Sequence, residues 1–153
     1  MLIGLISDTH GLLRPEALRA LRGVALILHA GDVGGREVLA RLRDLAPVRA
    51  VAGNVDDPAD PDLEHAVSVQ AGTLRVHVTH GHELGNPTPE KLLVRYPADV
   101  LVYGHTHRAL VHRTVDRLVV NPGAAGPRRF DLKPSVALLT IEGGDTDVRI
   151  VPL

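Results

Sequence analysis

Seven side chains that commonly bind metals stand in five short segments of the chain, each directly after a run of apolar residues. They supply carboxylate, amide and imidazole ligands: Asp8, His10, Asp32, Asn54, His80, His105 and His107. A tetrahedral site for one ion needs only four ligands, so this set is better suited to two ions that share a carboxylate. Paired divalent ions are typical of enzymes that cleave phosphate esters with water. The pattern therefore predicts a two-metal hydrolase.

Each segment is expected at the carboxyl end of a β-strand. Leu5 and Ile6, for example, precede Asp8. Open α/β sheets bind ligands just beyond the carboxyl ends of their strands, so the five segments can converge on one crevice. Residues two apart in an extended chain point the same way. Asp8 and His10 are therefore expected to face a common site, as are the last two histidines of the set.

Hydrophobic periodicity predicts alternating strands and helices in the first part of the chain. Short continuous apolar runs indicate strands, and apolar residues spaced by three or four indicate helices. Strands are expected at 1–7, 24–30 and 48–52, with helices at 15–22 and 37–45 between them. This order indicates parallel strands joined by right-handed crossovers.

The second part of the chain is predicted to be mostly β. A loop rich in Asp and Pro at 56–62 precedes a hairpin of strands at 66–70 and 74–79. A helix at 89–95 and a strand at 99–103 follow. We expect antiparallel pairing for the remaining strands at 110–115, 118–120, 136–141 and 148–151. The predicted fold class is α/β, with two packed sheets flanked by helices.

Composition limits the classes of protein to consider. The chain has 153 residues, of which 44% are hydrophobic, so one domain over 1–153 is expected. The absence of cysteine excludes disulfides, thiolate metal ligands and cysteine nucleophiles. The apolar N-terminal run is too short for a signal peptide or a membrane span, and no other stretch approaches spanning length. We therefore expect a cytoplasmic protein with no membrane partner.

Charge and aromatic content disfavour a nucleic-acid polymer as partner. The formal net charge is -1, and the chain has only two tyrosines, one phenylalanine and no tryptophan on which bases could stack. A nucleotide-binding module is disfavoured because neither glycine-rich phosphate-binding motif is present. Small phosphodiesters, including cyclic nucleotides, remain open as substrates, and a homo-oligomer is compatible with the sequence.

Five sequence blocks, in this order, resemble the motifs of calcineurin-like metallophosphoesterases. The blocks are Asp8-Thr9-His10, Gly31-Asp32, Gly53-Asn54-Val55-Asp56, His80-Gly81-His82 and Gly104-His105-Thr106-His107. Their order and spacing, with Asn121-Pro122-Gly123 further on, are similar to the small bacterial and archaeal phosphodiesterase branch. The resemblance implies a four-layer α/β/β/α sandwich of two mixed sheets flanked by helices.

The resemblance also implies roles for the residues. Asp8, His10 and His107 hold one ion; Asn54, His80 and His105 hold the other; Asp32 bridges both. Asp56 orients a metal-ligating histidine or asparagine. Two ions about 3.5 to 4 Å apart share a hydroxide that attacks phosphorus in line. The implied catalytic residues are Asp32, Asn54, Asp56, His80, His105 and His107. We expect manganese, with Zn, Fe, Co and Ni as alternatives.

One position departs from the phosphomonoesterases of this family. Those enzymes often carry histidine after the motif asparagine, where this chain has Val55. Valine cannot give a proton to a departing alkoxide, so the expected substrate is a small phosphodiester. The alternative function is a non-catalytic metal-binding scaffold, because the eukaryotic retromer complex contains a subunit of similar fold that serves chiefly as a protein-binding platform. Every ligand position is filled here, which favours catalysis.

Other polar residues have two interpretations each. His82 either lies at the mouth of the crevice or is a solvated loop residue. His29 falls within a predicted strand, which favours a buried histidine with satisfied hydrogen bonds over a ligand. Arg128 and Arg129 are adjacent in a loop, where they are solvated or recruit phosphate.

Overall fold

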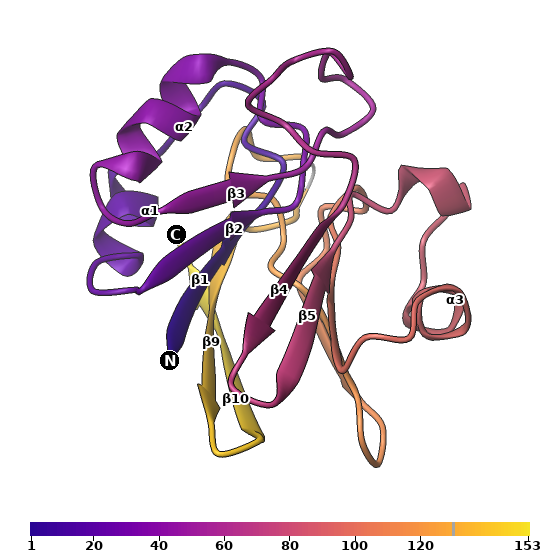
Figure 1. Cartoon of the computed structure of the whole chain (residues 1–153). Coiled ribbons are helices and arrows are strands. Elements are labelled where there is room, and N and C mark those ends of the chain that lie inside the picture. Colours follow the sequence, from indigo (N-terminus) through magenta and orange to yellow (C-terminus); the bar gives the residue numbers. More distant parts are fainter. Residues whose placement is uncertain (130) are drawn as a thin grey trace.

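Two five-stranded sheets pack face to face, with helices on both outer faces (Figure 1). The structure is a computed structural model that describes residues 1–129 and 131–153. Its elements in chain order are β1 (Leu2–Ile6), α1 (Pro15–Ala20), β2 (Leu26–His29), α2 (Arg36–Arg43), β3 (Val48–Ala50), β4 (Val67–Ala71), β5 (Leu74–Val78), the 3-10 helix η1 (His82–Leu84), α3 (Pro89–Arg95), β6 (Val100–Val102), β7 (Leu110–Arg113), β8 (Leu118–Asn121), β9 (Ser135–Glu142) and β10 (Asp145–Pro152).

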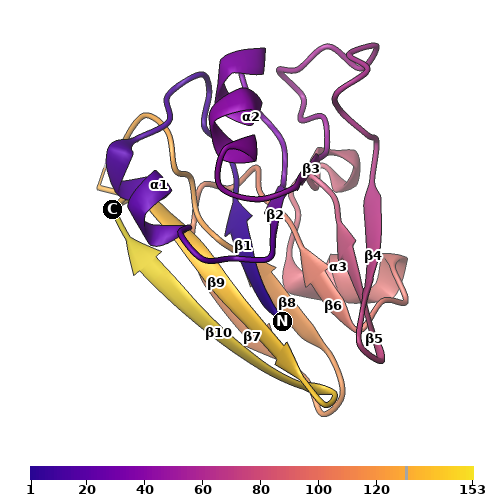
Figure 2. The same cartoon turned by 60° about the vertical axis from the view of Figure 1, so that its left-hand side comes forward.

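The first sheet has the order β10-β9-β1-β2-β3. β1, β2 and β3 are parallel, and α1 and α2 lie in the connections between them, as predicted from the alternating pattern. β9 runs antiparallel to β1, and β10 runs antiparallel to β9. The end of the chain thus returns to extend the sheet that its beginning starts (Figure 2).

The second sheet has the order β4-β5-β6-β8-β7. The predicted hairpin of β4 and β5 is confirmed, and β6 is parallel to β5. Antiparallel pairing of all late strands is wrong for β8, which lies parallel to β6. The reason is that β7 runs opposite to β8 and takes the outer position, so the chain has reversed twice when it reaches β8.

Three hydrophobic clusters hold the layers together. The largest lies between the two sheets and includes Leu5, Leu28, Val76, Val102 and Leu139. A second cluster packs α1 and α2 on the first sheet through residues such as Leu21, Ile27, Leu39 and Leu42. A third packs α3 on the second sheet through Leu92, Leu101 and Val119. The architecture is therefore the four-layer α/β/β/α sandwich that the motif blocks implied.

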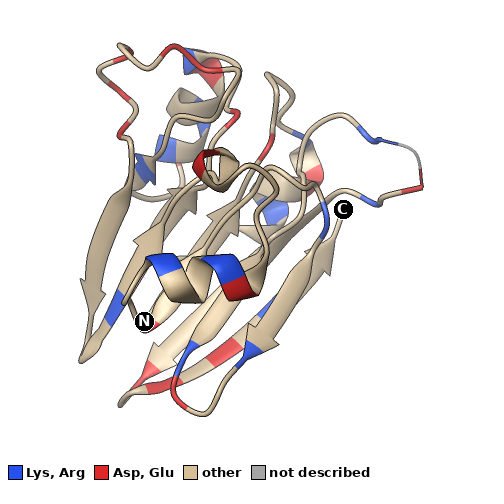
Figure 3. Ribbon diagram, turned by 90° about the vertical axis from the view of Figure 1, so that its right-hand side faces the viewer, with Lys and Arg blue, Asp and Glu red and all other residues tan. Residues whose placement is uncertain are grey.

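Charged residues are most frequent on the helices, on the loops and near the ends of strands, and long stretches of the strands carry none (Figure 3). This distribution follows from the burial of the sheets between the helical layers. No helix in the described part of the chain combines the length and the apolar character needed to cross a membrane.

Shortening one side chain between the sheets should destabilise the protein strongly. Leu139 is fully buried in β9, so Leu139→Ala is expected to lower the free energy of unfolding by about 2 to 5 kcal/mol. Val115 is fully exposed, and Val115→Ala should change that free energy by less than about 0.5 kcal/mol. Urea unfolding of both variants measures the difference. Equal losses would contradict the placement of Leu139 in the core.

Candidate metal centre

The five segments meet at one end of the sandwich. Asp8 and His10 follow β1, Asp32 follows β2 and Asn54 follows β3, all from the first sheet. The remaining predicted ligands follow strands of the second sheet: His80 after β5, and His105 and His107 after β6. The centre therefore lies across the carboxyl ends of parallel strands from both sheets, which explains how residues far apart in sequence come together.

Five of the seven predicted ligands have left-handed backbone conformations. Their φ angles are 53° at Asp8, 47° at His10, 53° at Asp32, 71° at His105 and 62° at His107. No other non-glycine residue in the described ranges has a positive φ. Each such conformation costs about 1 to 3 kcal/mol and persists where the surroundings enforce it, commonly at functional sites. The expectation that the segments of Asp8 and His10 and of His105 and His107 are extended is therefore wrong, because all four residues have left-handed conformations.

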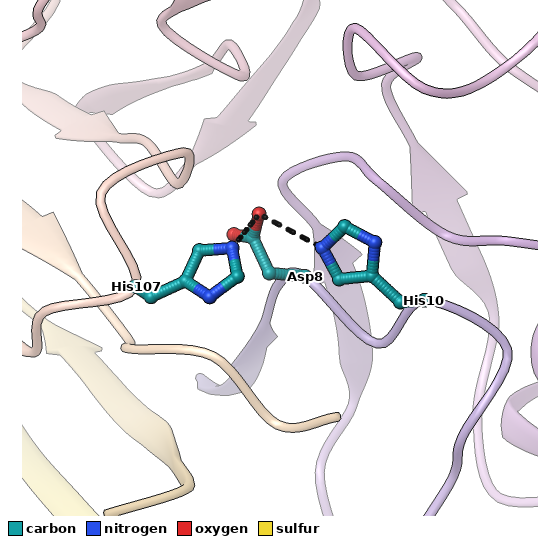
Figure 4. A group of neighbouring side chains, drawn as sticks. All are labelled: Asp8, His10 and His107. Atoms are coloured by element: carbon teal, nitrogen blue, oxygen red, sulfur yellow. Dashed lines mark ion pairs between the residues drawn. The ribbon is translucent and has the colours of Figure 1, made fainter. Parts of the chain in front are cut away.

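The two carboxylate oxygens of Asp8 have different surroundings. Its Oδ2 accepts hydrogen bonds from the His105 N–H at 3.1 Å and from the Ser7 hydroxyl. Its Oδ1 faces two imidazoles, at 3.2 Å from His107 Nε2 and 3.8 Å from His10 Nε2 (Figure 4). One oxygen is thus fixed by local contacts while the other remains directed at the ligand set.

Asp32 is arranged in the same way. Its Oδ1 accepts a hydrogen bond from the Val55 N–H at 3.1 Å. Its Oδ2 lies 3.6 Å from His10 Nε2 and 3.4 Å from His80 Nε2. The free oxygen of Asp32 therefore lies between a histidine of the first predicted ligand set and a histidine of the second.

His80 directs its Nε2 toward the other predicted ligands. Its Nδ1 is 2.8 Å from the carbonyl oxygen of Ala30 and must donate its hydrogen there, which leaves Nε2 as an acceptor in the neutral ring. This Nε2 lies 3.0 Å from Asn54 Oδ1 and 3.3 Å from His105 Nδ1. A histidine that donates one ring N–H to a backbone carbonyl and directs the other nitrogen at a cluster of ligands is typical of metal sites.

The centre contains more oxygen and nitrogen lone pairs than hydrogen-bond donors to pair with them. There are two groups of residues in which the potential ligand atoms all lie within 4.8 Å of one another. The first is Asp8, His10 and His107, and the second is Asp8, Asp32 and His80. Asp8 Oδ1 and His10 Nε2 are buried and make no hydrogen bond with any described residue. Buried polar atoms normally have hydrogen-bond partners, so the lack of partners for these two atoms is consistent with a site for cations. The residues present therefore suit divalent metal ions.

The electrostatics of the centre favour positive charge. Burial by itself would raise the pKa of Asp32, but His80 and the Val55 N–H outweigh it and lower this pKa to about 2. The pKa of Asp8 is also lowered, because His107, His80 and Ser7 outweigh its burial. Burial would lower the pKa of His80, yet the two carboxylates raise it. Both aspartates are thus ionised at neutral pH and available to a cation.

Asp56 contacts backbone rather than the ligand side chains. Its carboxylate accepts hydrogen bonds from the N–H groups of Val33 at 3.1 Å, Gly34 at 3.1 Å and Gly53 at 2.8 Å. It therefore joins the turn after β2 to the turn after β3. This differs from the predicted contact with a ligating histidine or asparagine, although Asp56 still acts on the loops that carry Asp32 and Asn54.

Sequence reasoning gave no role to Asn121, which supports the histidine loop. Asn121 is fully buried, and its Nδ2 donates to the Gly104 carbonyl at 3.1 Å and to Thr106 Oγ1 at 3.0 Å. These bonds hold the segment between His105 and His107. The signal was present in the Asn121-Pro122-Gly123 motif, but the pattern carries no information about what the amide contacts.

A groove opens beside the centre at Asn54. Its volume is about 460 Å³, and its lining includes His65, His82, Glu83 and Tyr96. The His82 ring lies 5.3 Å from the ring of His80, so of its two interpretations the structure favours a place at the mouth of the crevice. His29 is buried and hydrogen-bonded, as expected.

Arg128 and Arg129 are exposed and lie beside the other end of the centre. With Lys133 they surround a small hollow that also contacts His107. This position is compatible with either of their two interpretations.

Comparison with known proteins places the chain in a family. Residues 1–144 match the model of the calcineurin-like phosphoesterase superfamily domain. A probable metallophosphoesterase of Methanothermobacter thermautotrophicus is 39% identical over 162 residues, which cover 99% of this chain and 92% of the relative. The phosphodiesterase YfcE of Escherichia coli is 34% identical over 142 residues, with 77% and 76% covered. Among solved structures, a Vps29 mutant from Entamoeba histolytica has a TM-score of 0.81 at 25% identity and covers 100% of this chain and 99% of its own. The chain belongs to the calcineurin-like phosphoesterase superfamily, the family that its five motif blocks resemble.

Proposed function

We propose that this protein is a metal-dependent phosphodiesterase that hydrolyses small phosphodiesters. The observation that carries the proposal is the convergence of carboxylate, amide and imidazole lone pairs at one end of the sandwich, with Asp8 Oδ1 and His10 Nε2 buried and without hydrogen-bond partners among the described residues. Membership of a phosphoesterase superfamily and the likeness to a named phosphodiesterase support this assignment.

The distances support the ligand roles that the motif blocks implied. Asp8, His10 and His107 form one set, Asn54, His80 and His105 the other, and Asp32 lies between them. Two divalent ions, when bound, would lower the pKa of water and neutralise negative charge on phosphoryl oxygens. The Ala30 carbonyl fixes the tautomer of His80, and the Val55 N–H fixes the orientation of Asp32. We propose manganese as the ion.

The surroundings of the centre favour a diester over a monoester. The groove at Asn54 has room for the ester group that remains attached to phosphorus or for the one that leaves. Val55, beside Asn54, is 57% exposed, and its side chain cannot protonate an alkoxide. A good leaving group needs no such proton, so aryl diesters should react while alkyl monoesters should react poorly.

A scaffold that binds metal without turnover is the second candidate. It is favoured by the close likeness of fold to Vps29 proteins, one of which is named as vacuolar protein sorting 29 of Cryptosporidium parvum. These names record no phosphoesterase activity. The complete set of directed ligand atoms in this chain favours the enzyme, and a measurement of metal binding together with turnover separates the two.

The test uses protein stripped with a chelator and then supplied with Mn²⁺. We expect no hydrolysis of bis(p-nitrophenyl) phosphate before metal is added, and metal-dependent hydrolysis afterwards. p-Nitrophenyl phosphate has the same leaving group but no second ester group to occupy the groove at Asn54, so its turnover should be lower by about tenfold or more. An alkyl monoester should react more slowly still, because no proton donor replaces the missing histidine. Faster turnover of monoesters would contradict the diesterase assignment. Bound Mn²⁺ without any turnover would instead indicate the scaffold.

A further inference from the structure

His29 is a buried histidine beneath the metal centre for which the proposed reaction has no direct use. It is the last residue of β2, and it is 0% exposed. It follows Leu28 and stands three positions before Asp32. A fully buried histidine in a strand requires partners for both ring nitrogens, and those partners lie in the two turns that carry Asp8 and Asp32.

The hydrogen bonds of His29 have only one consistent direction. The Gly31 N–H donates to His29 Nδ1 at 3.1 Å, so Nδ1 must be unprotonated. The ring hydrogen is therefore on Nε2, which lies 3.0 Å from Thr9 Oγ1 and donates to it. The Thr9 hydroxyl in turn donates to the Val33 carbonyl at 2.8 Å. Every donor and acceptor in this chain of bonds is used, provided that His29 is neutral.

Burial agrees with the neutral state of His29. Loss of solvation lowers the pKa of this ring to about 4, although Asp8, Asp56 and Asp32 oppose that shift. At neutral pH the ring is therefore uncharged, and Nδ1 is free to accept from Gly31.

The two turns that His29 and Thr9 join are also joined by backbone. The Asp8 N–H donates to the Gly31 carbonyl at 2.9 Å, and the His10 N–H donates to the Asp32 carbonyl at 3.0 Å. Asp8, His10 and Asp32 all have left-handed conformations here, so their positions depend on what holds the turns together. The hydrogen bond between His29 and Thr9 adds a side-chain contact to these backbone contacts between the two turns.

We propose that neutral His29 and Thr9 are a pair of positioning residues that fixes the spacing of Asp8 and Asp32 and thereby sets the affinity of the centre for divalent ions. The inference rests on the proposed metal-binding function. Neither residue belongs to the predicted ligand set. They act by holding the turns on which three of the ligands stand.

The first test is the Mn²⁺ affinity of Thr9→Val, measured by calorimetry on chelator-stripped protein. Valine keeps the shape of threonine but removes the hydroxyl, which leaves His29 Nε2 and the Val33 carbonyl without a partner. We expect the dissociation constant for Mn²⁺ to rise about 10- to 100-fold, as happens when groups behind metal ligands are lost. Thr9→Ser keeps the hydroxyl and should restore most of the affinity.

A control variant tests whether the change from threonine to valine by itself affects Mn²⁺ binding. Thr140 lies in β9, away from the centre, and Thr140→Val makes the same chemical change there. This variant should bind Mn²⁺ as the unmodified protein does. If Thr9→Val also binds Mn²⁺ normally, the inference is wrong while the proposed function stands. If the unmodified protein binds no Mn²⁺, the proposed function itself fails.

A second measurement needs neither metal nor a variant. Heteronuclear NMR of the histidine rings in metal-free protein reports which nitrogen carries the hydrogen. We expect His29 to be protonated on Nε2 and unprotonated on Nδ1 throughout the neutral pH range. A protonated Nδ1 is incompatible with the Gly31 contact and would overturn the inference even if Thr9→Val did not fold.

Discussion

Asp32→Asn is expected to lower metal-dependent phosphodiester hydrolysis by about a thousandfold. The free Oδ2 of Asp32 lies 3.6 Å from His10 Nε2 and 3.4 Å from His80 Nε2, so it is the group that would contact both ions of the proposed pair. Asparagine keeps the size of the side chain but replaces the anionic oxygen with a neutral one. Stabilisation of transition-state charge by metal ions is worth several kcal/mol, and each 1.36 kcal/mol, roughly, is a factor of ten in rate.

The measurement is the hydrolysis of bis(p-nitrophenyl) phosphate across a titration with Mn²⁺, together with calorimetric metal binding. Asp145→Asn is the matched control, because Asp145 is exposed at the start of β10, at the end of the sandwich away from the centre. It should retain the activity of the unmodified protein. The metal-free Asp32→Asn protein should remain folded by circular dichroism. Undiminished hydrolysis by folded Asp32→Asn would contradict the proposed role of Asp32 between two ions.

Local patterns predicted the elements of the fold better than their pairing. The structure has α3 at Pro89–Arg95, where Pro at the start, Thr88 as N-cap and an apolar face give a strong signal. The early parallel strands were predicted because helices alternate with them. The parallel position of β8 and the return of β9 to β1 were not, because apolar runs identify a strand but do not identify its neighbours.

Residue type and order predict which residues converge at the candidate metal centre, but they do not predict how the protein holds these residues. Aspartate, asparagine and histidine after five strands indicate a site, whereas the left-handed turns at Asp8 and His105 arise from tertiary contacts. The same limit applies to Asp56, which contacts backbone N–H groups. Contacts to backbone depend on how loops from different strands pack, and sequence spacing does not encode that.

Gly53 illustrates a constraint that only the packed structure reveals, and Gly53→Ala should be the second most damaging change. A Cβ at this position would overlap the Asp32 carboxylate oxygen Oδ1 and its backbone nitrogen, and would lie 2.7 Å from its Cγ. Real Cβ atoms essentially never come so close, so the turn after β2 or the turn after β3 must move. The Gly53 N–H also donates to Asp56, which restricts the movement of its own turn.

We therefore expect Gly53→Ala to displace Asp32 and to reduce kcat/KM for an aryl diester by about a hundredfold, the loss typical of a misplacement near 1 Å. The free energy of unfolding should fall by about 1 to 3 kcal/mol through overpacking.

Gly72→Ala in the β4–β5 turn is the control, because its φ of 59° strains alanine but nothing lies within 4 Å of the new Cβ. It should lose a similar amount of stability and no activity. If both variants lose activity in proportion to stability, then close packing of Gly53 on Asp32 does not position the metal centre. A loss of activity in Gly53→Ala alone would show that the close packing of the Gly53 backbone on Asp32 positions this aspartate between the two predicted ligand sets.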